Sequence, residues 1–101
     1  MRILLSCGGM MSSSQLAEYI KDAATKKGID LEIDATGIDH IEDDLHREKY
    51  DLLLLAPQVS YRADYVRKQL EEQNIPLVLI KGNLYNPLYA GEILEDIKEF
   101  L

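Results

Sequence analysis

Cysteine and tryptophan are scarce in this chain of 101 residues, which has one cysteine, Cys7, and no tryptophan. One cysteine cannot form an internal disulfide, so we expect a packed core in a reducing compartment. Long apolar runs are also missing: no run approaches the roughly 20 residues that span a bilayer. The apolar run after Arg2 is too short for a signal peptide. These absences predict a cytoplasmic protein.

Basic residues are scarce as well. The chain has 11 lysines and arginines against 18 aspartates and glutamates, which gives a net charge of −7. Because binding to a phosphate backbone needs a basic footprint, we do not expect nucleic acid as a partner. No repeat or low-complexity tract divides the sequence. We therefore predict one domain over residues 1–101, which is a suitable length for a single core.

Metal-ligand patterns are not evident in the sequence. His40 and His46 lie in or beside a short acidic segment, and we interpret both as surface residues. The run Glu42-Asp43-Asp44 is most simply a solvated helix face. We predict neither a metal site nor a cofactor.

The hydrophobic pattern alternates between strand-like and helix-like segments. Short apolar runs indicate strands, and apolar residues at helical spacing follow each of them. Such alternation is typical of an α/β fold with a parallel sheet and helices on both faces. We predict strands at 3–6, 31–35, 51–56 and 76–80, and helices at 12–27, 36–47, 61–73 and 87–100.

The strand patterns also predict the order of the sheet. Residues 3–6 and 51–56 are almost uniformly apolar, as expected for central strands covered on both faces. Residues 31–35 alternate, which favours an edge strand with one face partly exposed. Strand order 2-1-3-4 fits these patterns. The chain then changes direction between strands one and three, and the loops 7–14 and 56–62 meet at this switch point, where ligands usually bind.

Cys7 lies at this predicted switch point. It ends the first strand, and a glycine-bearing turn and a run of serines lead into the first helix. The N–H groups at a helix start lack partners and favour negative charge, so they can hold an anion and give a nearby cysteine more thiolate character. We predict that Cys7 is a nucleophile and that a phosphoryl group is held by Gly8, Gly9, Met10, Met11, Ser12, Ser13 and Ser14.

The segment after the third strand is the second part of the predicted site. We expect Gln58 or Tyr61 to reach the phosphoryl group or a partner, although strand termination and helix entry would also explain this sequence. Arg62 and Arg67 could offset phosphate charge, but long side chains on a helix are usually solvated. Tyr85 belongs to the last loop at the same end of the sheet, and we rank it lower.

Three segments carry a resemblance to a known family: Ile3-Leu4-Leu5-Ser6-Cys7, Met11-Ser12-Ser13-Ser14, and Ala56-Pro57-Gln58-Val59-Ser60-Tyr61. The chain resembles the enzyme IIB component of the lactose/cellobiose branch of the bacterial phosphotransferase system, which includes N,N′-diacetylchitobiose. One position departs from the family pattern, because Met10 stands where the family usually has glycine.

The resemblance implies a phosphoryl relay. A phosphohistidine on the IIA component would phosphorylate Cys7, which would then phosphorylate a sugar that enters through the membrane-embedded IIC component. The sugar would be a β-linked disaccharide such as cellobiose, lactose or chitobiose. The protein would act in the bacterial cytoplasm, at the inner face of the membrane when bound to IIC.

A phosphatase is a competing interpretation of the cysteine loop. Low-molecular-weight tyrosine phosphatases place a similar loop after the first strand, but they carry an arginine clamp six positions after the cysteine, where this chain has Ser13. Without that clamp we expect a phosphocysteine that survives until the next partner arrives. The sequence also leaves open an anion-binding module, a regulatory relay, a redox-active Cys7 without a resolving cysteine, and a merely buried Cys7. Met10 and Met11 could pack in the core or contact partner proteins.

Overall fold

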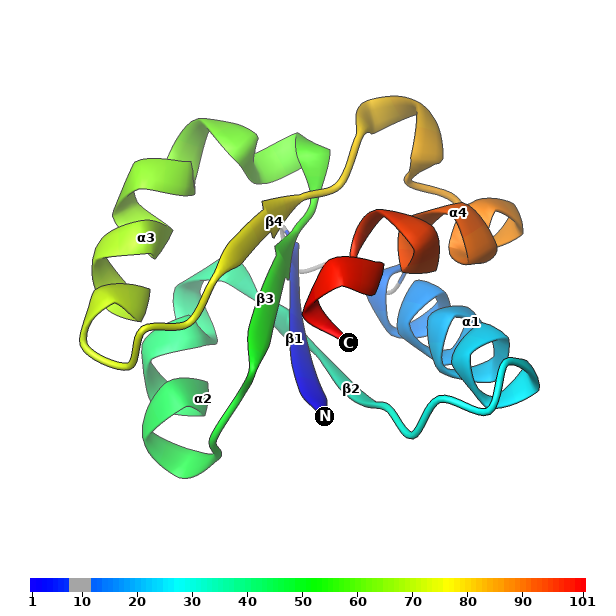
Figure 1. Cartoon of the computed structure of the whole chain (residues 1–101). Helices are drawn as coiled ribbons and strands as arrows, with labels where there is room; N and C mark the ends of the chain where they lie inside the picture. Colours follow the sequence, from blue (N-terminus) through cyan, green and yellow to red (C-terminus); the bar gives the residue numbers. More distant parts are fainter. Residues whose placement is uncertain (8–11) are drawn as a thin grey trace.

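The computed structural model describes residues 1–7 and 12–101 and, in Ser12 and Ser13, the backbone alone. Its sheet has four parallel strands: β1 (Arg2–Cys7), β2 (Glu32–Gly37), β3 (Leu52–Leu55) and β4 (Leu77–Leu79). The strand order is β2-β1-β3-β4, as predicted (Figure 1).

Four helices cover the two faces of the sheet. α1 (Ser12–Lys26) and α4 (Ala90–Asp96) lie on one face, and α2 (Ile41–Arg47) and α3 (Ala63–Glu71) lie on the other (Figure 1). Short 3₁₀ segments connect the elements: η1 (Ile38–His40), η2 (Pro57–Arg62), η3 (Gly82–Leu84), η4 (Pro87–Tyr89) and η5 (Lys98–Phe100). In the described part of the chain, no helix is long and apolar enough to cross a membrane.

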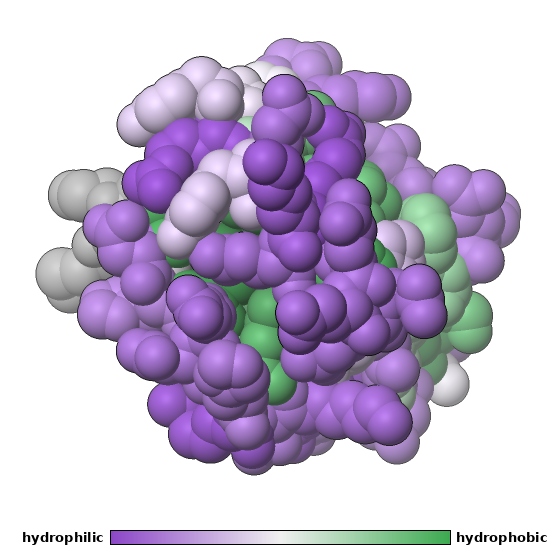
Figure 2. Space-filling model, turned by 90° about the vertical axis from the view of Figure 1, so that its left-hand side faces the viewer, coloured by the Kyte–Doolittle hydropathy of each residue, from purple (hydrophilic) through white to green (hydrophobic). Residues whose placement is uncertain are grey.

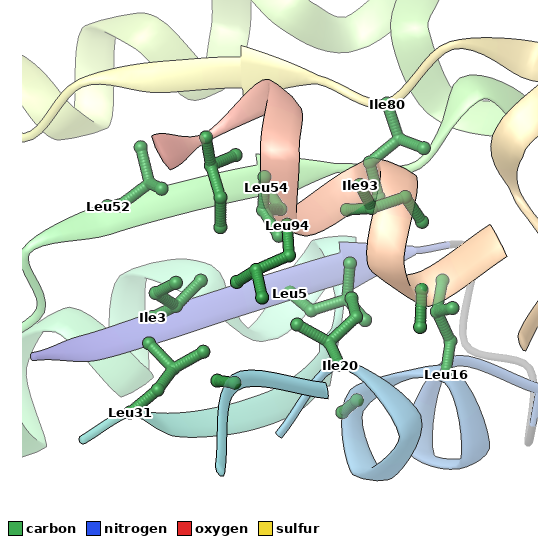
Figure 3. Close-up of a cluster of buried hydrophobic side chains, with 14 residues drawn as sticks. Ile3, Leu5, Leu16, Ile20, Leu31, Leu52, Leu54, Ile80, Ile93 and Leu94 are labelled. Atoms are coloured by element: carbon green, nitrogen blue, oxygen red, sulfur yellow. The ribbon is translucent and has the colours of Figure 1, made fainter. Parts of the chain in front are cut away.

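The sheet separates two clusters of buried side chains. Successive residues of a strand point to opposite faces. Ile3 and Leu5 therefore pack under α1 and α4 (Figure 3), whereas Leu4 packs under α2 and α3. All three side chains are fully buried. Burial on both faces explains why β1 shows no hydrophobic alternation.

Local signals in the sequence place several helix ends correctly. Gly28 follows α1 with a φ of 74°, a conformation that favours glycine, and the Ile29 N–H donates to the Ala24 carbonyl oxygen at 2.9 Å. At the start of the last helical segment, the Asn86 side chain accepts a hydrogen bond of 2.8 Å from the Leu88 N–H, as a capping residue does.

The bounds of several elements differ from the prediction. β2 extends through Thr36 and Gly37, which we assigned to a helix start, because both residues pair with the end of β1. The third helix, predicted over 61–73, begins at Ala63 and ends at Glu71, because Tyr61 and Arg62 belong to the 3₁₀ segment η2. The predicted last helix is divided at Ile97, with φ and ψ of −103° and 4°.

The burial of several side chains differs from the prediction. Tyr89 and Leu101 lie at the apolar spacing of the predicted last helix, but each is 43% exposed. Asp44 was expected in solvent but is buried, and one of its carboxylate oxygens accepts a hydrogen bond from Arg47. In β2, residues 33–37 are all partly buried, so the predicted alternation of that strand is weak. Each difference comes from long-range packing, which helical or strand periodicity does not record.

Candidate functional site

Cys7 is the last residue of β1, and its side chain is 3% exposed. It pairs with Gly37 in β2 and packs in one cluster with Ile38 and Val59. Beside it, the Ala56 N–H donates to the Ser6 carbonyl oxygen at 2.9 Å. The segments that follow β2 and β3 are therefore held against the end of β1, as the predicted switch point requires.

The predicted phosphate-binding loop lies partly outside the described residues. The residues that are not described are Gly8, Gly9, Met10 and Met11. The predicted packing of the two methionines therefore also lies outside the described residues. α1 begins directly after them at Ser12, and its first turn contains the predicted Ser12, Ser13 and Ser14. Of these three, only Ser14 has a described side chain, and it is exposed. The first turn of α1 thus follows Cys7 after four residues of sequence.

The second predicted segment is exposed at its two candidate side chains. Gln58 and Tyr61 both lie in η2, and Tyr61 is 81% exposed. Val59 lies between them and packs with Cys7. Val59 thus fixes the segment, while Gln58 and Tyr61 face outward. Their supporting role stays a prediction.

Arg62 has a more defined environment than the sequence indicated. Its Nη1 lies 3.2 Å from Oδ1 of Asp39 in η1, and its guanidinium carbon lies 4.6 Å from the centre of the Tyr65 ring. The Arg62 side chain is 31% exposed. No local pattern could indicate this pair, because Asp39 and Arg62 are 23 residues apart.

Tyr85, which we ranked below Gln58 and Tyr61 as a site residue, packs against the core cluster that contains Cys7. It lies between η3 and η4 and is partly buried against both core clusters, one of which contains Cys7. The conspicuous signal in the sequence was its position in a loop at the carboxyl end of a strand.

A polar network occupies the opposite end of the sheet. The Asp34 carboxylate accepts hydrogen bonds from Arg2 Nη1 at 3.1 Å and from the Tyr50 hydroxyl at 2.8 Å. Burial, together with the bond to Asp34, raises the pKa of Tyr50 to about 12. Arg2 begins β1 and Tyr50 precedes β3, so this network holds the amino ends of the strands.

Two hollows of the described surface lie away from Cys7. A groove of about 300 Å³ separates α2 from α3 and is lined by Leu45, His46 and Gln69. Figure 2 shows this largely hydrophilic side of the molecule. A wider, polar hollow of about 700 Å³ lies alongside β2. A covalent phosphoryl carrier needs hydrogen-bond donors around its nucleophile, so it does not require a deep cavity.

The histidines agree with their predicted surface position, because His40 and His46 are both exposed. Among the described residues, no group of three histidine, cysteine or acidic side chains is arranged to hold a metal ion. The acidic residues of α2 differ in burial, since Asp44 is buried whereas Glu42 and Asp43 are exposed.

Comparison with known families identifies the family of the chain. Residues 2–96 match the family described as the lactose/cellobiose-specific IIB subunit of the PTS, the phosphotransferase system. The chain belongs to this family. The protein is therefore a phosphotransferase component of sugar uptake, as predicted, and IIB components work with IIA and IIC partners in that process.

Named relatives support the same assignment. The chain is 34% identical to the galactose-specific EIIB component of Lactococcus lactis subsp. cremoris, over 91% of this chain and 88% of the relative. It is also 34% identical to the oligo-beta-mannoside-specific EIIB component of Bacillus subtilis, over 83% and 80% of the two chains.

Solved structures of IIB components have the same fold. The lactose-specific IIB domain from Streptococcus pneumoniae superimposes with a TM-score of 0.79 and 25% identity, over 95% of each chain. The cellobiose-specific IIB component from Borrelia burgdorferi gives a TM-score of 0.74 and 27% identity, over 99% of this chain and 90% of the other. The predicted α/β fold class is thus confirmed.

Proposed function

We propose that this IIB component carries the phosphoryl group on Cys7. The observation that supports the proposal is the position of Cys7, which ends β1 at the switch point of the sheet, four residues before α1 begins. Residues 8–11 and the first turn of α1, from Ser12 to Ser14, supply the phosphate-binding N–H groups. Gln58 and Tyr61 flank the partner that approaches this end of the sheet.

The relay has two balanced steps. In the first, the Cys7 sulfur attacks the phosphorus of a phosphohistidine on IIA. The S–P bond forms, the N–P bond breaks, and the imidazole nitrogen keeps the bonding electron pair. In the second, a sugar hydroxyl oxygen attacks the same phosphorus, the S–P bond breaks, and the hydroxyl proton passes to a base or to water. Covalent catalysis divides one transfer into two in this way.

Preorganised donors are the contribution of the protein to both steps. In phosphoryl transfer, charge spreads over three oxygens, and fixed N–H groups stabilise it without reorganisation. The start of α1 adds its positive dipole end to that site. Ser13 provides no bidentate guanidinium, so attack by water on the phosphocysteine is poorly stabilised and the intermediate survives until the acceptor arrives.

The acceptor that we propose is a β-linked disaccharide, such as cellobiose, lactose or chitobiose, presented by IIC. The relatives named for cellobiose and oligo-beta-mannosides support this sugar class. The chain would work in the cytoplasm and at the inner face of the membrane when bound to IIC. It would need no metal and no cofactor for this chemistry.

The test is the intact mass of the purified protein after incubation with a complete phosphoenolpyruvate-driven relay. Wild type is expected to gain one phosphate, in an adduct that resists acid but is lost with iodine. Cys7→Ser and Cys7→Ala should gain no such adduct while keeping the wild-type circular dichroism spectrum. An acid-stable, iodine-sensitive adduct on either variant would refute the assignment of Cys7. Release of phosphate from an aryl phosphate by wild type, without an adduct, would instead indicate a phosphatase.

A further inference from the structure

The segments η1 and η2 flank the end of β1 from two sides. β1 lies between β2 and β3 in the sheet, and η1 and η2 follow these two neighbours at their carboxyl ends. Ile38 in η1 and Val59 in η2 both pack in the cluster that contains Cys7. Side chains that follow these two residues therefore lie around the end of β1.

One ion pair joins the two flanking segments. Arg62 Nη1 at the end of η2 lies 3.2 Å from Asp39 Oδ1 in η1. The Tyr65 ring, 4.6 Å from the guanidinium carbon, supports the same arginine from α3. Asp39 is 79% exposed, and ion pairs with so exposed a partner contribute little to stability. Arg62 is thus held between η1 and α3, while its bond to Asp39 is easily exchanged.

Phosphorylation changes the electrostatics of this rim. A phosphoryl group adds nearly two negative charges near neutral pH, and this chain already has a net charge of −7. The other described charged or titratable groups that follow the strand ends here are His40, Glu42, Asp43, Asp64 and Lys81, and Lys81 Nζ lies 3.8 Å from Asp96. Arg62 follows Val59 of the Cys7 cluster, and its present partner, the Asp39 carboxylate, is weakly held.

We propose that Arg62 is a positioning residue for the phosphoryl group on Cys7, with Asp39 as its exchangeable partner. This inference rests on the proposed function. The phosphoryl group attracts Arg62 and repels Asp39, so phosphorylation transfers the guanidinium from the carboxylate to a phosphoryl oxygen. The link between η1 and η2 is then released, and the surface around Cys7 differs between the two states of the carrier. Arg62 thereby offsets part of the negative charge of the phosphoryl group, which the uncharged Ser13 cannot do.

The experiment compares four variants of the phosphorylated protein by ³¹P NMR. Arg62→Gln removes the cation, Arg62→Lys keeps its charge, and Asp39→Asn releases the arginine. Arg67→Gln is the matched control, because Arg67 is an exposed arginine in α3 whose Nη1 lies 3.3 Å from Asp64. The two measured quantities are the pKa of the phosphoryl group and the fraction of phosphorylated Cys7 at equilibrium with the donor.

Loss of a neighbouring cation disfavours the dianion. Arg62→Gln should raise the pKa of the phosphoryl group by about 0.5 units and lower the ratio of phosphorylated to unphosphorylated protein roughly fivefold. Arg62→Lys should retain most of both values. Asp39→Asn should lower that pKa, and Arg67→Gln should leave it unchanged.

The outcomes separate this inference from the proposed function. Equal titration of wild type, Arg62→Gln and Arg67→Gln overturns the role of Arg62 while the adduct on Cys7 still forms. Absence of the adduct in wild type overturns the proposed function itself. Because Asp39→Asn changes the pKa in the opposite direction, general damage to the fold cannot reproduce the whole pattern. An Asp39→Asn protein whose pKa rises would also refute the exchange.

Discussion

The Ser6 hydroxyl is fully buried beside Cys7 and has no hydrogen-bond partner among the described residues. Ser6 pairs with Leu55 in β3 and, by strand alternation, shares the face of Leu4. A buried polar group without a partner costs about 1–3 kcal/mol relative to a satisfied one. We therefore predict that Ser6→Ala stabilises the protein.

The expected magnitude follows from two opposing effects. Removal of the hydroxyl eliminates the cost of its desolvation. It also leaves a void of about 20 Å³, which costs roughly 0.5 kcal/mol. The net change in the free energy of unfolding should be about +1 kcal/mol. For a domain of this size, that corresponds to an increase in Tm of about 4–8 °C.

Urea unfolding followed by circular dichroism measures this change. The slope of the free energy of unfolding against urea concentration should stay at the wild-type value, since the same surface is exposed on unfolding. Ser60→Ala is the matched control, because Ser60 is exposed in η2, and its effect should be within about 0.5 kcal/mol of zero. Destabilisation by Ser6→Ala would refute the reasoning and show that the hydroxyl has a partner in solution.

Two glycines should respond to alanine in opposite directions. At both positions an added Cβ meets open space. Gly28→Ala should lower the free energy of unfolding by about 1 kcal/mol because of its φ of 74°. Gly91→Ala inside α4 should raise the free energy of unfolding by about 0.5–1 kcal/mol. Urea unfolding that shifts the stability of both variants in the same direction would contradict this prediction. Tyr50 has a pKa raised to about 12 in the folded state, so the unfolded chain loses the Tyr50 proton first as pH rises above its ordinary pKa. Wild type should lose stability between about pH 10 and 12, and a Tyr50→Phe protein with the same pH dependence of urea unfolding would refute that assignment.

Sequence patterns alone predicted the order of the elements, the order of the strands and the place of Cys7. These features depend on local patterns and on general rules of chain topology. Uniformly apolar runs marked β1 and β3 as central strands, and the strand order that they favour placed Cys7 at the switch point. The candidate nucleophile could be found because it ends a strand directly before a helix. Residues 8–11, which belong to the predicted phosphate-binding loop, lie outside the described residues.

The contacts between side chains that are far apart in the sequence became visible in the folded structure. Pairing with β1 extended β2 through Gly37, and packing left Tyr89 exposed and Asp44 buried. The contact between Arg62 and Asp39 joins residues from two different connections. The Ser6 hydroxyl is without a described hydrogen-bond partner because β3 and the neighbouring core enclose it. Helical or strand periodicity reports which face a residue shares with its near neighbours, whereas burial and pairing depend on the atoms that a distant segment brings to that face.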